Sequence, residues 1–561
     1  MKDRSCTLSR SGTVWRASTV LTVVIVLLAG VLLNGIGATA RATDLPTPAD
    51  PTVTPSTVPG KPVVDPTGPL LATPDTGTQR EYSAATWDVL ANDRCANVTP
   101  CTKAHLATPM TITSFPTGWT VFLTEDDQIA VRIPDGNKSG SYTIAYTITD
   151  GSATASTYLR LSVYLPKTPD HYNPPQGSRF SRAFVRGSAG HIRSGILRTI
   201  NSAPRGSQIR IMSWSFASPA YRQALHAAML RGVSVQIIMA KPIDPKLSDL
   251  AKLRKIFGSN RYAKDSLRGS WVYQCRGSCR GTGGVMHAKI FMFSQSYNTR
   301  WIVMTGSGNM TDFAAEGQWN QIYTTTNNQA AYNAVLTEFM QAKLDKPHRP
   351  RTLTVALPAT TYWFTPLNAD TTKADFLYQQ LNQVACTNSG TSTGRTRIRI
   401  AMYTWTGKRG LWMARKIRAM WNAGCDVRIV YAIMGTQVRG ILYSPAGRGR
   451  IPMRQTLLVD EDHQPIWYLH QKYIVVGGNI AGKPDQYESF QGSFNFSDLG
   501  MHSDENMQEL TGYSNFAPYV EDFNQVWVQP QTRAPDPNSY VSAEDRTIKL
   551  GTGRYKYMDP D

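Results

Sequence analysis

The sequence predicts an α/β protein made of two duplicated units, with an all-β sandwich before them. From about residue 167, apolar strand patterns alternate with helical patterns, and the same order of elements returns after about 190 residues. Strands separated by helices imply crossover connections and a largely parallel sheet. Residues 76–166 differ, because short segments of alternating apolar and polar residues are broken there by Gly, Pro, Asp and Asn. That pattern is typical of an antiparallel β-sandwich.

The start of the chain has the features of an export signal. Basic residues precede an uncharged apolar run that ends in Ala38-Thr39-Ala40. This order indicates a signal peptide at residues 1–40 and a secreted protein. The alternative is an uncleaved membrane anchor, because the run approaches the ~20 residues that span a bilayer. Residues 41–75 are rich in Pro and Thr, cannot build a core, and are expected to form an extended linker.

Composition limits the partners without selecting one. The 561-residue chain carries a formal net charge of +19, which favours anionic partners such as nucleic acid, anionic lipid or cell-wall polymer. We find no HExxH motif, no carboxylate cluster suited to magnesium and no phosphate-binding Walker loop. The sequence therefore predicts neither a metal nor another cofactor. No protein partner is indicated, and we expect a monomer.

Six cysteines follow the leader, and an even number in an exported chain suggests disulfides. Their proximity favours Cys95 with Cys101 and Cys275 with Cys279, which leaves Cys386 with Cys425. Because six cysteines allow about 15 pairings, other connectivities stay open.

The α/β region divides into a first unit at residues 177–345, a second unit at 346–530 and an irregular tail at 531–561. In the first unit, a strand at 207–216 precedes a helix at 219–231 that ends at Gly232. In the second unit, the matching strand is 396–405 and the matching helix runs from about 411 to 423, before Gly424. A closing helix is expected between about residues 512 and 527.

Each unit carries the same polar motif, which reads His-x-Lys, an apolar run, and Gly-Ser-x-Asn. Residues two apart in a strand share a face, so the His and the Lys should project together, as should the Ser and the Asn. One copy would mean little, whereas two copies at matching places indicate a site. The two copies are His287, Lys289, Gly306, Ser307 and Asn309, and His470, Lys472, Gly492, Ser493 and Asn495.

This paired motif resembles the phospholipase D superfamily across residues 177 to 530. The resemblance implies a phospholipase D fold, in which two α/β lobes are related by a pseudo-two-fold axis and share one active site. It also implies a metal-independent reaction through a phosphohistidine. The phrase GSFNFSD, followed by DEN, also resembles the bacterial phosphodiesterase and nuclease branch of that superfamily. Separately, WDVLAND and YTIAYTITDG resemble bacterial cadherin-like or immunoglobulin-like modules, which usually serve as spacers or adhesive units.

The chain departs from the superfamily pattern in two respects. The superfamily's Asp, seven residues after each His, is replaced by Ser294 and Gly477. Members also often carry a carboxylate after the Asn that orients the histidine, and Glu505 fits that role in the second unit. By alignment its counterpart is Trp319, beside Asn320, so the first unit is expected to use an amide or a different acid.

The chemistry that this motif suits is phosphodiester cleavage. One neutral imidazole attacks phosphorus while the protonated partner gives a proton to the leaving alcohol, and that partner then activates water. The lysines would compensate the charge of the phosphate, while the Asn and Ser side chains would donate hydrogen bonds to it, with the two glycines beside them. By analogy with the superfamily, His287 is the nucleophile and His470 the acid/base, although the residues themselves do not decide this.

Three functions stay open. The resemblance to secreted bacterial phospholipases D predicts hydrolysis of phospholipid headgroups, with transfer of the phosphatidyl group to alcohols as a second outcome. The basic charge and the GSFNFS phrase favour a metal-independent nuclease instead. Ser294 and Gly477 favour a third hypothesis, an inactive surface-binding protein. Two inserts with Arg and aromatic residues, at 264–285 and 434–456, are expected to border the cleft, unless they are solvated surface loops.

Overall fold

The computed structural model describes residues 68–536, apart from 81–83, 135–138, 165–168, 184, 186, 241–247, 263–268 and 460–464. The expected signal peptide at 1–40 lies outside the described residues. So do most of the expected linker and most of the C-terminal tail. Among the residues that are described, no helix is both long enough and apolar enough to cross a membrane.

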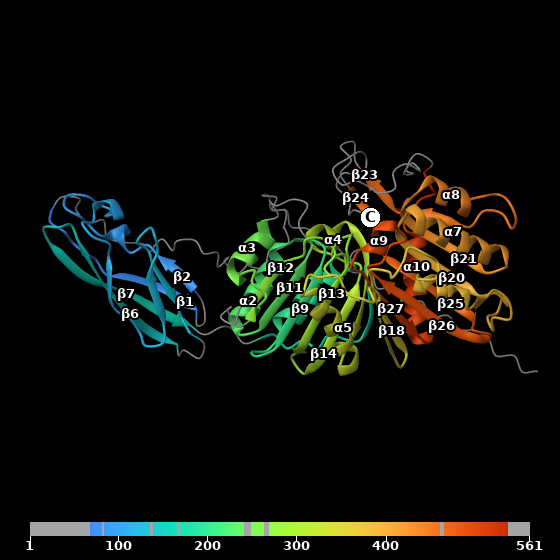
Figure 1. The fold of residues 1–561 in the computed structure, drawn as a ribbon, viewed down its shortest axis with the longest axis horizontal. Coiled ribbons are helices and arrows are strands. Elements are labelled where there is room, and N and C mark those ends of the chain that lie inside the picture. Colours follow the sequence, from blue (N-terminus) through green and yellow to red (C-terminus); the bar gives the residue numbers. More distant parts are fainter. Residues whose placement is uncertain are drawn as a thin grey trace, which may run out of the picture. The chain divides into compact units, whose positions relative to one another are not determined.

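The first described unit is a β-sandwich (Figure 1). Its sheets have the orders β1-β7-β6-β3 and β2-β5-β4, and their facing side chains form one apolar core around Trp87, Ile129 and Leu159. β1 pairs with β7 in parallel, so the expectation of a wholly antiparallel sandwich is wrong at this edge. The strands are β1 (Asp75–Arg80), β2 (Ala84–Trp87), β3 (Thr111–Ser114), β4 (Thr120–Leu123), β5 (Ile129–Arg132), β6 (Gly140–Thr149) and β7 (Thr154–Tyr164).

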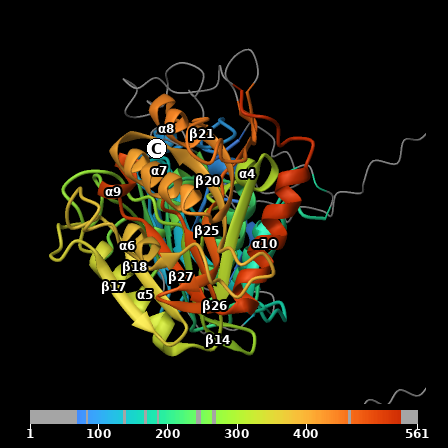
Figure 2. The same cartoon turned by 90° about the vertical axis from the view of Figure 1, so that its right-hand side faces the viewer.

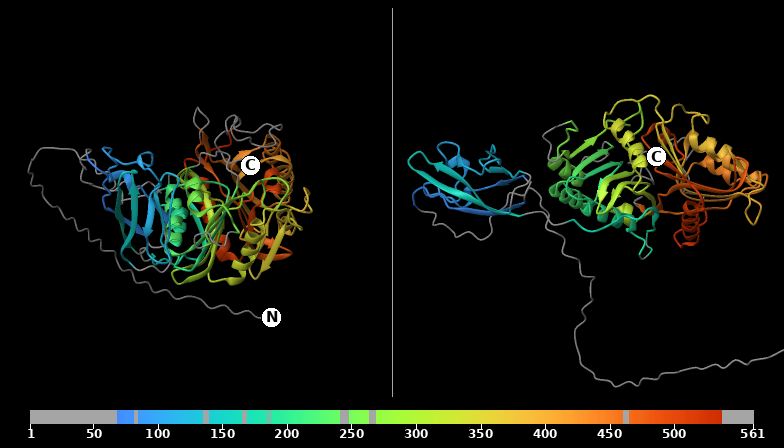
Figure 3. Two further views of the ribbon diagram at one scale, coloured as in Figure 1. Left: turned by 60° about the vertical axis from the view of Figure 1, so that its left-hand side comes forward. Right: turned by 90° about the horizontal axis from the view of Figure 1, so that it is seen from below.

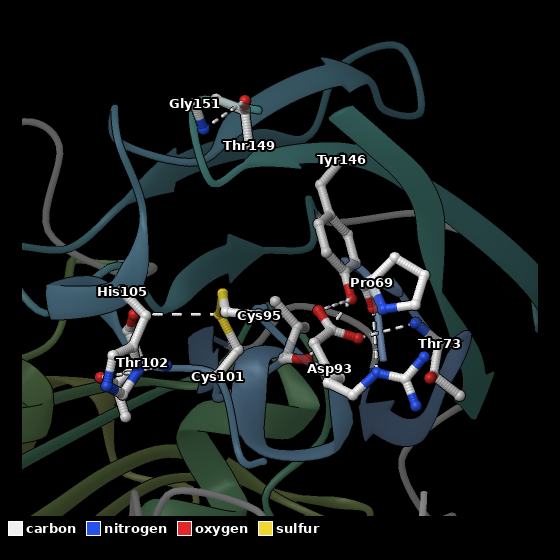
Figure 4. Close-up of a disulfide and its surroundings, with 12 residues drawn as sticks. Pro69, Thr73, Asp93, Cys95, Cys101, Thr102, His105, Tyr146, Thr149 and Gly151 are labelled. Carbon is white, nitrogen blue, oxygen red and sulfur yellow. Dashed lines mark hydrogen bonds between the residues drawn. A yellow bond between two sulfur atoms is a disulfide. The ribbon is translucent and has the colours of Figure 1, made fainter. Parts of the chain in front are cut away.

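The buried hydroxyl of Tyr146 links β1 to the loop that carries Asp93 (Figure 4). The Tyr146 hydroxyl lies 2.9 Å from Asp75 Oδ2 and 3.1 Å from Asp93 Oδ2. The Cys95–Cys101 disulfide closes a short loop beside Asp93. The other two disulfides join Cys275 to Cys279 and Cys386 to Cys425, so all three expected pairs are confirmed.

The first lobe runs from β8 to α5 and is organised around one mixed sheet. β12, β11 and β9 are parallel, whereas β9, β13, β14 and β16 pair antiparallel in that order. The helix expected at 219–231 is confirmed as α2, which has Pro219 in its first turn and ends at Gly232 with φ of 98°. The elements are β8 (Gly177–Ser181), α1 (His191–Asn201), β9 (Gln208–Ser213), β10 (Phe216–Ala217), α2 (Pro219–Arg231), β11 (Ser234–Met239), α3 (Ser248–Phe257), β12 (Trp271–Gln274), β13 (Ile290–Ser296), β14 (Thr299–Gly306), β15 (Met310–Thr311), α4 (Asp312–Glu316), β16 (Gln318–Thr325) and α5 (Gln329–Ala342).

The second lobe runs from β17 to α10 and repeats this plan. β20, β21 and β22 are parallel, while β25, β26 and β27 are antiparallel, so the expected largely parallel sheet is wrong in both lobes. The expected closing helix is α10, which packs on the sheet beside β25 and β26 (Figure 2). The elements are β17 (Leu353–Leu357), β18 (Thr360–Phe364), α6 (Phe376–Asn382), β19 (Val384–Ala385), β20 (Arg397–Trp405), α7 (Gly407–Asn422), β21 (Asp426–Met434), α8 (Thr436–Leu442), β22 (Met453–Gln455), β23 (Leu457–Val459), β24 (Pro465–Leu469), β25 (Lys472–Ile480), β26 (Lys483–Gly492), α9 (Asp498–His502), β27 (Asn506–Thr511) and α10 (Tyr513–Val528).

Two short backbone pairings connect the lobes among the described residues; in Figure 3 the first lobe is coloured from teal to yellow-green and the second from yellow to red. β16 of the first lobe pairs in parallel with β24 of the second, through Trp319 and Leu469. Met286 forms a parallel bridge with Asp504. Met286 and Leu469 each stand directly before a motif histidine, so both connections position the site.

Candidate active site

Each motif histidine is fixed by the backbone of the opposite lobe. The His287 amide donates to the Asp504 carbonyl at 2.9 Å, and the His470 amide donates to the Trp319 carbonyl at 2.9 Å. Both histidines are fully buried. Each half-motif is therefore held by the other lobe, and both motif lysines lie close enough to Glu505 to act on its charge.

The imidazole rings are held across the same interface. His287 Nδ1 lies 2.8 Å from Glu505 Oε1, and His470 Nδ1 lies 2.9 Å from Asn320 Oδ1. Glu505 thus orients the histidine of the first lobe, not that of its own lobe. Its counterpart is Asn320, so the alignment of Glu505 with Trp319 was wrong by one residue. The first lobe supplies an amide, which was one of the two alternatives.

The motif serines support these ring partners. Ser307 Oγ donates to Asn320 Oδ1 at 2.8 Å, and Ser493 Oγ donates to Glu505 Oε2 at 2.5 Å. Each serine therefore donates a hydrogen bond to the side chain that holds a histidine ring, a role that the sequence does not predict.

The motif glycines allow close approach of neighbouring strands. A Cβ atom on Gly306 would lie 2.2 Å from the Gln321 carbonyl oxygen, and one on Gly492 would lie 2.0 Å from the Asn506 carbonyl oxygen. Neither oxygen can move easily, because both belong to the backbone of a paired strand. The glycines thus set the spacing that brings Ser307 and Ser493 to their partners.

Each motif lysine contacts the backbone of its motif histidine. Lys289 Nζ donates to the His287 carbonyl at 2.7 Å, and Lys472 Nζ donates to the His470 carbonyl at 2.8 Å. Both lysines are buried, as are Asn309 and Asn495. Asn309 also lines a small internal cavity with Asn320.

Sequence reasoning missed a buried ion pair behind the second half-motif. Arg409 Nε donates to Asp375 Oδ2 at 2.9 Å, and another guanidinium nitrogen donates to the Asn495 carbonyl. Both members of the pair are fully buried. An Arg and an Asp separated by 34 residues give no local signal, so only the fold brings them together.

Trp214, which follows β9, and Tyr403, within β20, also contact the histidine rings. The rings of Trp214 and His287 have centroids 6.1 Å apart, and those of Tyr403 and His470 have centroids 4.9 Å apart. Lys472 Nζ lies 4.5 Å from the centre of the Tyr403 ring. Trp214 is partly exposed whereas Tyr403 is buried, so the two halves differ in the surface that they offer.

The site is electrostatically positive. Burial raises the pKa of Glu505 to about 7, although the neighbouring lysines and Arg409 act in the opposite direction. Asn320 in the matching position adds no charge. Because Asp375 offsets the charge of Arg409, the two motif lysines face one titrating carboxyl, which suits an anionic ligand. Among the described residues, no group of three or more His, Cys, Asp or Glu side chains is arranged to hold a metal ion.

The positions of the superfamily's missing Asp have local structural roles. Ser294 Oγ accepts a hydrogen bond from the Gln208 amide at 2.8 Å, which ties β13 to β9. At Gly477, a Cβ atom would lie 2.7 Å from Phe516 Cζ of α10, so the helix occupies the space of a side chain. Each strand is thus supported without the Asp.

Part of the arginine content of the inserts is structural. Arg448 donates to the Trp421 and Cys425 carbonyls at 2.8 and 2.7 Å, and Arg454 donates to the Trp527 carbonyl. Residues 264–268 of the other insert lie outside the described residues. The part from Cys275 onward contacts Asp504 of the second lobe.

Comparison with protein families gives two matches. Residues 196–342 match the model described as "Cardiolipin synthase, PLD-like domain", and residues 65–160 match the bacterial Ig domain. The chain carries a phospholipase D-like domain and a bacterial Ig domain. The match to the phospholipase D-like domain includes the first half-motif and Asn320, while the second half-motif lies beyond it. This domain supports a phosphodiesterase activity in general.

Three solved structures illustrate what the chain is similar to. Nuc from Salmonella typhimurium, a phospholipase D family member, is 24% identical, covers 30% of this chain and 94% of its own, and has a TM-score of 0.23. NucT from Helicobacter pylori is 19% identical, with 30% and 96% covered and a TM-score of 0.24. Polyphosphate kinase from Porphyromonas gingivalis is 11% identical, with 79% and 81% covered and a TM-score of 0.41. The comparison with curated proteins finds no match.

Proposed function

We propose that the protein is a metal-independent phosphodiesterase in which His287 and His470 form one catalytic pair. The observation that carries this proposal is that each imidazole ring is held by a side chain of the other lobe. Each Nδ1 is held by a side chain of the opposite lobe, so that Nε2 is the ring atom directed to chemistry. Two histidines held in this way can divide nucleophilic attack and proton transfer.

The difference between the ring partners supports His287 as the nucleophile. Its Nε2 lone pair attacks phosphorus, and the bond to the leaving oxygen breaks as His470 gives that oxygen a proton. The Glu505 carboxylate, through Nδ1–H, stabilises the positive charge of the phosphorylated ring. The neutral Asn320 does not hold a proton on His470 by charge, so this ring can release one.

The second half of the reaction returns both rings to their starting state. His470 accepts a proton from water as the water oxygen attacks phosphorus, and the bond between phosphorus and His287 breaks. The product is a phosphomonoester. An alcohol in place of water gives transfer of the phosphoryl-bearing group. Lys289, Lys472, Asn309 and Asn495 compensate the charge of the phosphate oxygens in both halves.

For the substrate, we propose a phospholipid headgroup at a membrane or vesicle surface. The family model takes its name from cardiolipin synthase, and cardiolipin is a phospholipid. Disulfides and a bacterial Ig domain support a secreted protein that meets such surfaces. The net charge of +19 favours nucleic acid as the alternative substrate.

The test uses the purified protein after EDTA treatment. Its substrates are bis(p-nitrophenyl) phosphate, phosphatidylcholine vesicles, and single- and double-stranded DNA. We expect hydrolysis without added metal, and loss of at least about 10³-fold in His287→Asn and His470→Asn. His105→Asn, an exposed histidine of the Ig domain, is the matched control. Activity that survives both site substitutions, or that needs a metal, would overturn the proposal.

The same assay separates the remaining alternatives. p-Nitrophenol leaves without a proton donor, so His470→Asn should accumulate an acid-labile phosphoenzyme, whereas His287→Asn should form none. The reverse result would exchange the two roles. Cleavage of DNA that weakens steeply with salt, with no lipid cleavage, would establish the nuclease. No activity on any phosphodiester would leave the inactive surface-binding protein.

A further inference from the structure

A disulfide-closed loop of the first lobe holds a buried carboxylate of the second. Ser278 Oγ donates to Asp504 Oδ1 at 2.9 Å, the Arg280 amide donates to the same oxygen at 3.1 Å, and the Cys279 amide donates to Oδ2. The three donors lie within or next to the loop that the Cys275–Cys279 disulfide closes. Asp504 is fully buried, so its carboxyl depends on these donors.

Arg280 anchors the loop to both lobes. Its guanidinium lies 2.9 Å from Glu338 Oε2 on α5 of the first lobe. It also donates to the carbonyl oxygens of Thr365 and Arg351, on the second-lobe side, at 2.9 Å each. Arg280 and Glu338 are buried, so a shift of the loop would expose or orphan charged groups.

The held residue stands between the loop and the proposed nucleophile. The Asp504 amide donates to the Val285 carbonyl, and the Asp504 carbonyl accepts from the His287 amide, both at 2.9 Å. The next residue is Glu505, whose carboxyl orients the His287 ring at 2.8 Å. Displacement of Asp504 would therefore move both the backbone and the ring partner of His287.

In the His470 half of the site, an aromatic residue stands where the His287 half has Asp504. Trp319 occupies the place of Asp504, because its carbonyl accepts from the His470 amide. The Trp319 indole is buried and donates to Gln529 Oε1 at 2.7 Å, so apolar packing and a neutral hydrogen bond fix it. The disulfide-closed loop that holds Asp504 is thus a feature of the His287 half and not a requirement of the duplicated fold.

We propose that Asp504 is a positioning residue for the Glu505–His287 pair, and that the Cys275–Cys279 loop must be closed for it to act. The proposal rests on the proposed function, because it concerns the efficiency of that same site. If Asp504 contributed only to folding, its substitution would lower the fraction of folded protein. The kcat of the folded fraction would not change.

The first test compares two disulfides with bis(p-nitrophenyl) phosphate as substrate. Cys275→Ser/Cys279→Ser opens the loop, and Cys95→Ser/Cys101→Ser opens a similar short loop in the Ig domain. We expect kcat of folded protein to fall about 10²-fold in the first variant with KM within about twofold, since small misplacements have effects of that size. The second variant should keep the wild-type kcat. Equal effects in both variants would overturn the proposal.

Single substitutions keep the test decisive if the loop variant unfolds. Ser278→Ala removes one of the three donors, and we expect kcat to fall about fivefold, the equivalent of one weakened hydrogen bond. Asp504→Asn keeps the shape but turns one acceptor into a donor that faces backbone amides, so a larger loss is expected. An unchanged kcat in both would exclude a positioning role.

A measurement without substrate separates this proposal from the proposed function. In protein with ¹⁵N-labelled histidine, the Nδ1 signal of His287, assigned by its absence in His287→Asn, reports the bond to Glu505. We expect that signal to shift or broaden in Asp504→Asn and in the loop variant, while the His470 signal stays. An unchanged His287 signal would overturn the proposal. Absence of activity in the wild type would overturn the proposed function alone.

Discussion

At the residue scale, the two histidines differ in the charge of the group that holds Nδ1. Glu505 can carry a negative charge, whereas Asn320 cannot, and both make hydrogen bonds of nearly equal length. We therefore expect Glu505→Gln to keep the geometry and lose the charge. Formation of the phosphoenzyme should slow by about 10²-fold, because the charged ring is no longer stabilised. Rapid-quench measurement with bis(p-nitrophenyl) phosphate checks this, and an unchanged rate would remove Glu505 from the mechanism.

The complementary substitution is Asn320→Asp, which places a carboxylate against His470. A carboxylate favours the protonated ring, so the acid/base group should keep its proton to higher pH. We expect the maximum of the pH–rate profile to move upward, with a lower maximal rate because the ring releases its proton less readily. Steady-state rates across the pH range measure this. A profile that moves downward would contradict the acid/base assignment of His470.

At the element scale, the close approach of strands at the motif glycines controls the site. Gly492→Ala would place Cβ 2.0 Å from a backbone oxygen of β27, so β26 and β27 must separate. We expect a loss of stability of about 3 kcal/mol or more and loss of activity. Gly308→Ala is the matched control, because its nearest contact would be 3.5 Å from Asn320 Cγ, an ordinary separation. Denaturant unfolding of both variants tests the difference, which should vanish if strand spacing is unimportant.

Local sequence patterns along the strands predict only part of the site. The step of two in a strand predicts that each His and its Lys project together, but β13 begins at Ile290 and β25 at Lys472, so neither histidine lies in a strand and the shared face stays a prediction. The partners of the rings are 218 and 150 residues away, across the lobes, so no local pattern brings them to the histidines. The sequence predicts largely parallel sheets because helical patterns separate the strands that it shows most clearly. β13 and β14, like β25 and β26, are instead joined by tight turns at Tyr297-Asn298 and Ala481-Gly482.

At the scale of the whole molecule, buried carboxyls gather where the lobes meet. Asp522 of α10 lies 2.9 Å from Arg182 Nε of the first lobe and 3.0 Å from the Tyr473 hydroxyl of the second. Burial raises the pKa of Asp522 to about 6, and that of Asp504 and Glu505 to about 7. We therefore expect the interface between the lobes to respond to pH near neutrality.

These raised pKa values predict that stability and activity respond to pH in opposite directions. A carboxyl with a raised folded-state pKa binds more protons in the folded than in the unfolded chain, so the free energy of unfolding falls as pH rises through that value. We expect the melting temperature to be higher at pH 6 than at pH 8. Over the same interval, protonation of Glu505 removes the charge that assists His287, so kcat should be lower at pH 6. Calorimetry and steady-state rates on the same samples measure both.

Glu505→Gln should reduce both the pH dependence of the melting temperature and that of kcat. Asp150→Asn should change neither, because hydrogen bonds from the Ala153 and Ser152 amides and the Ser152 hydroxyl lower the pKa of this exposed carboxyl. A melting temperature that rises from pH 6 to pH 8 would show that other groups dominate the joint.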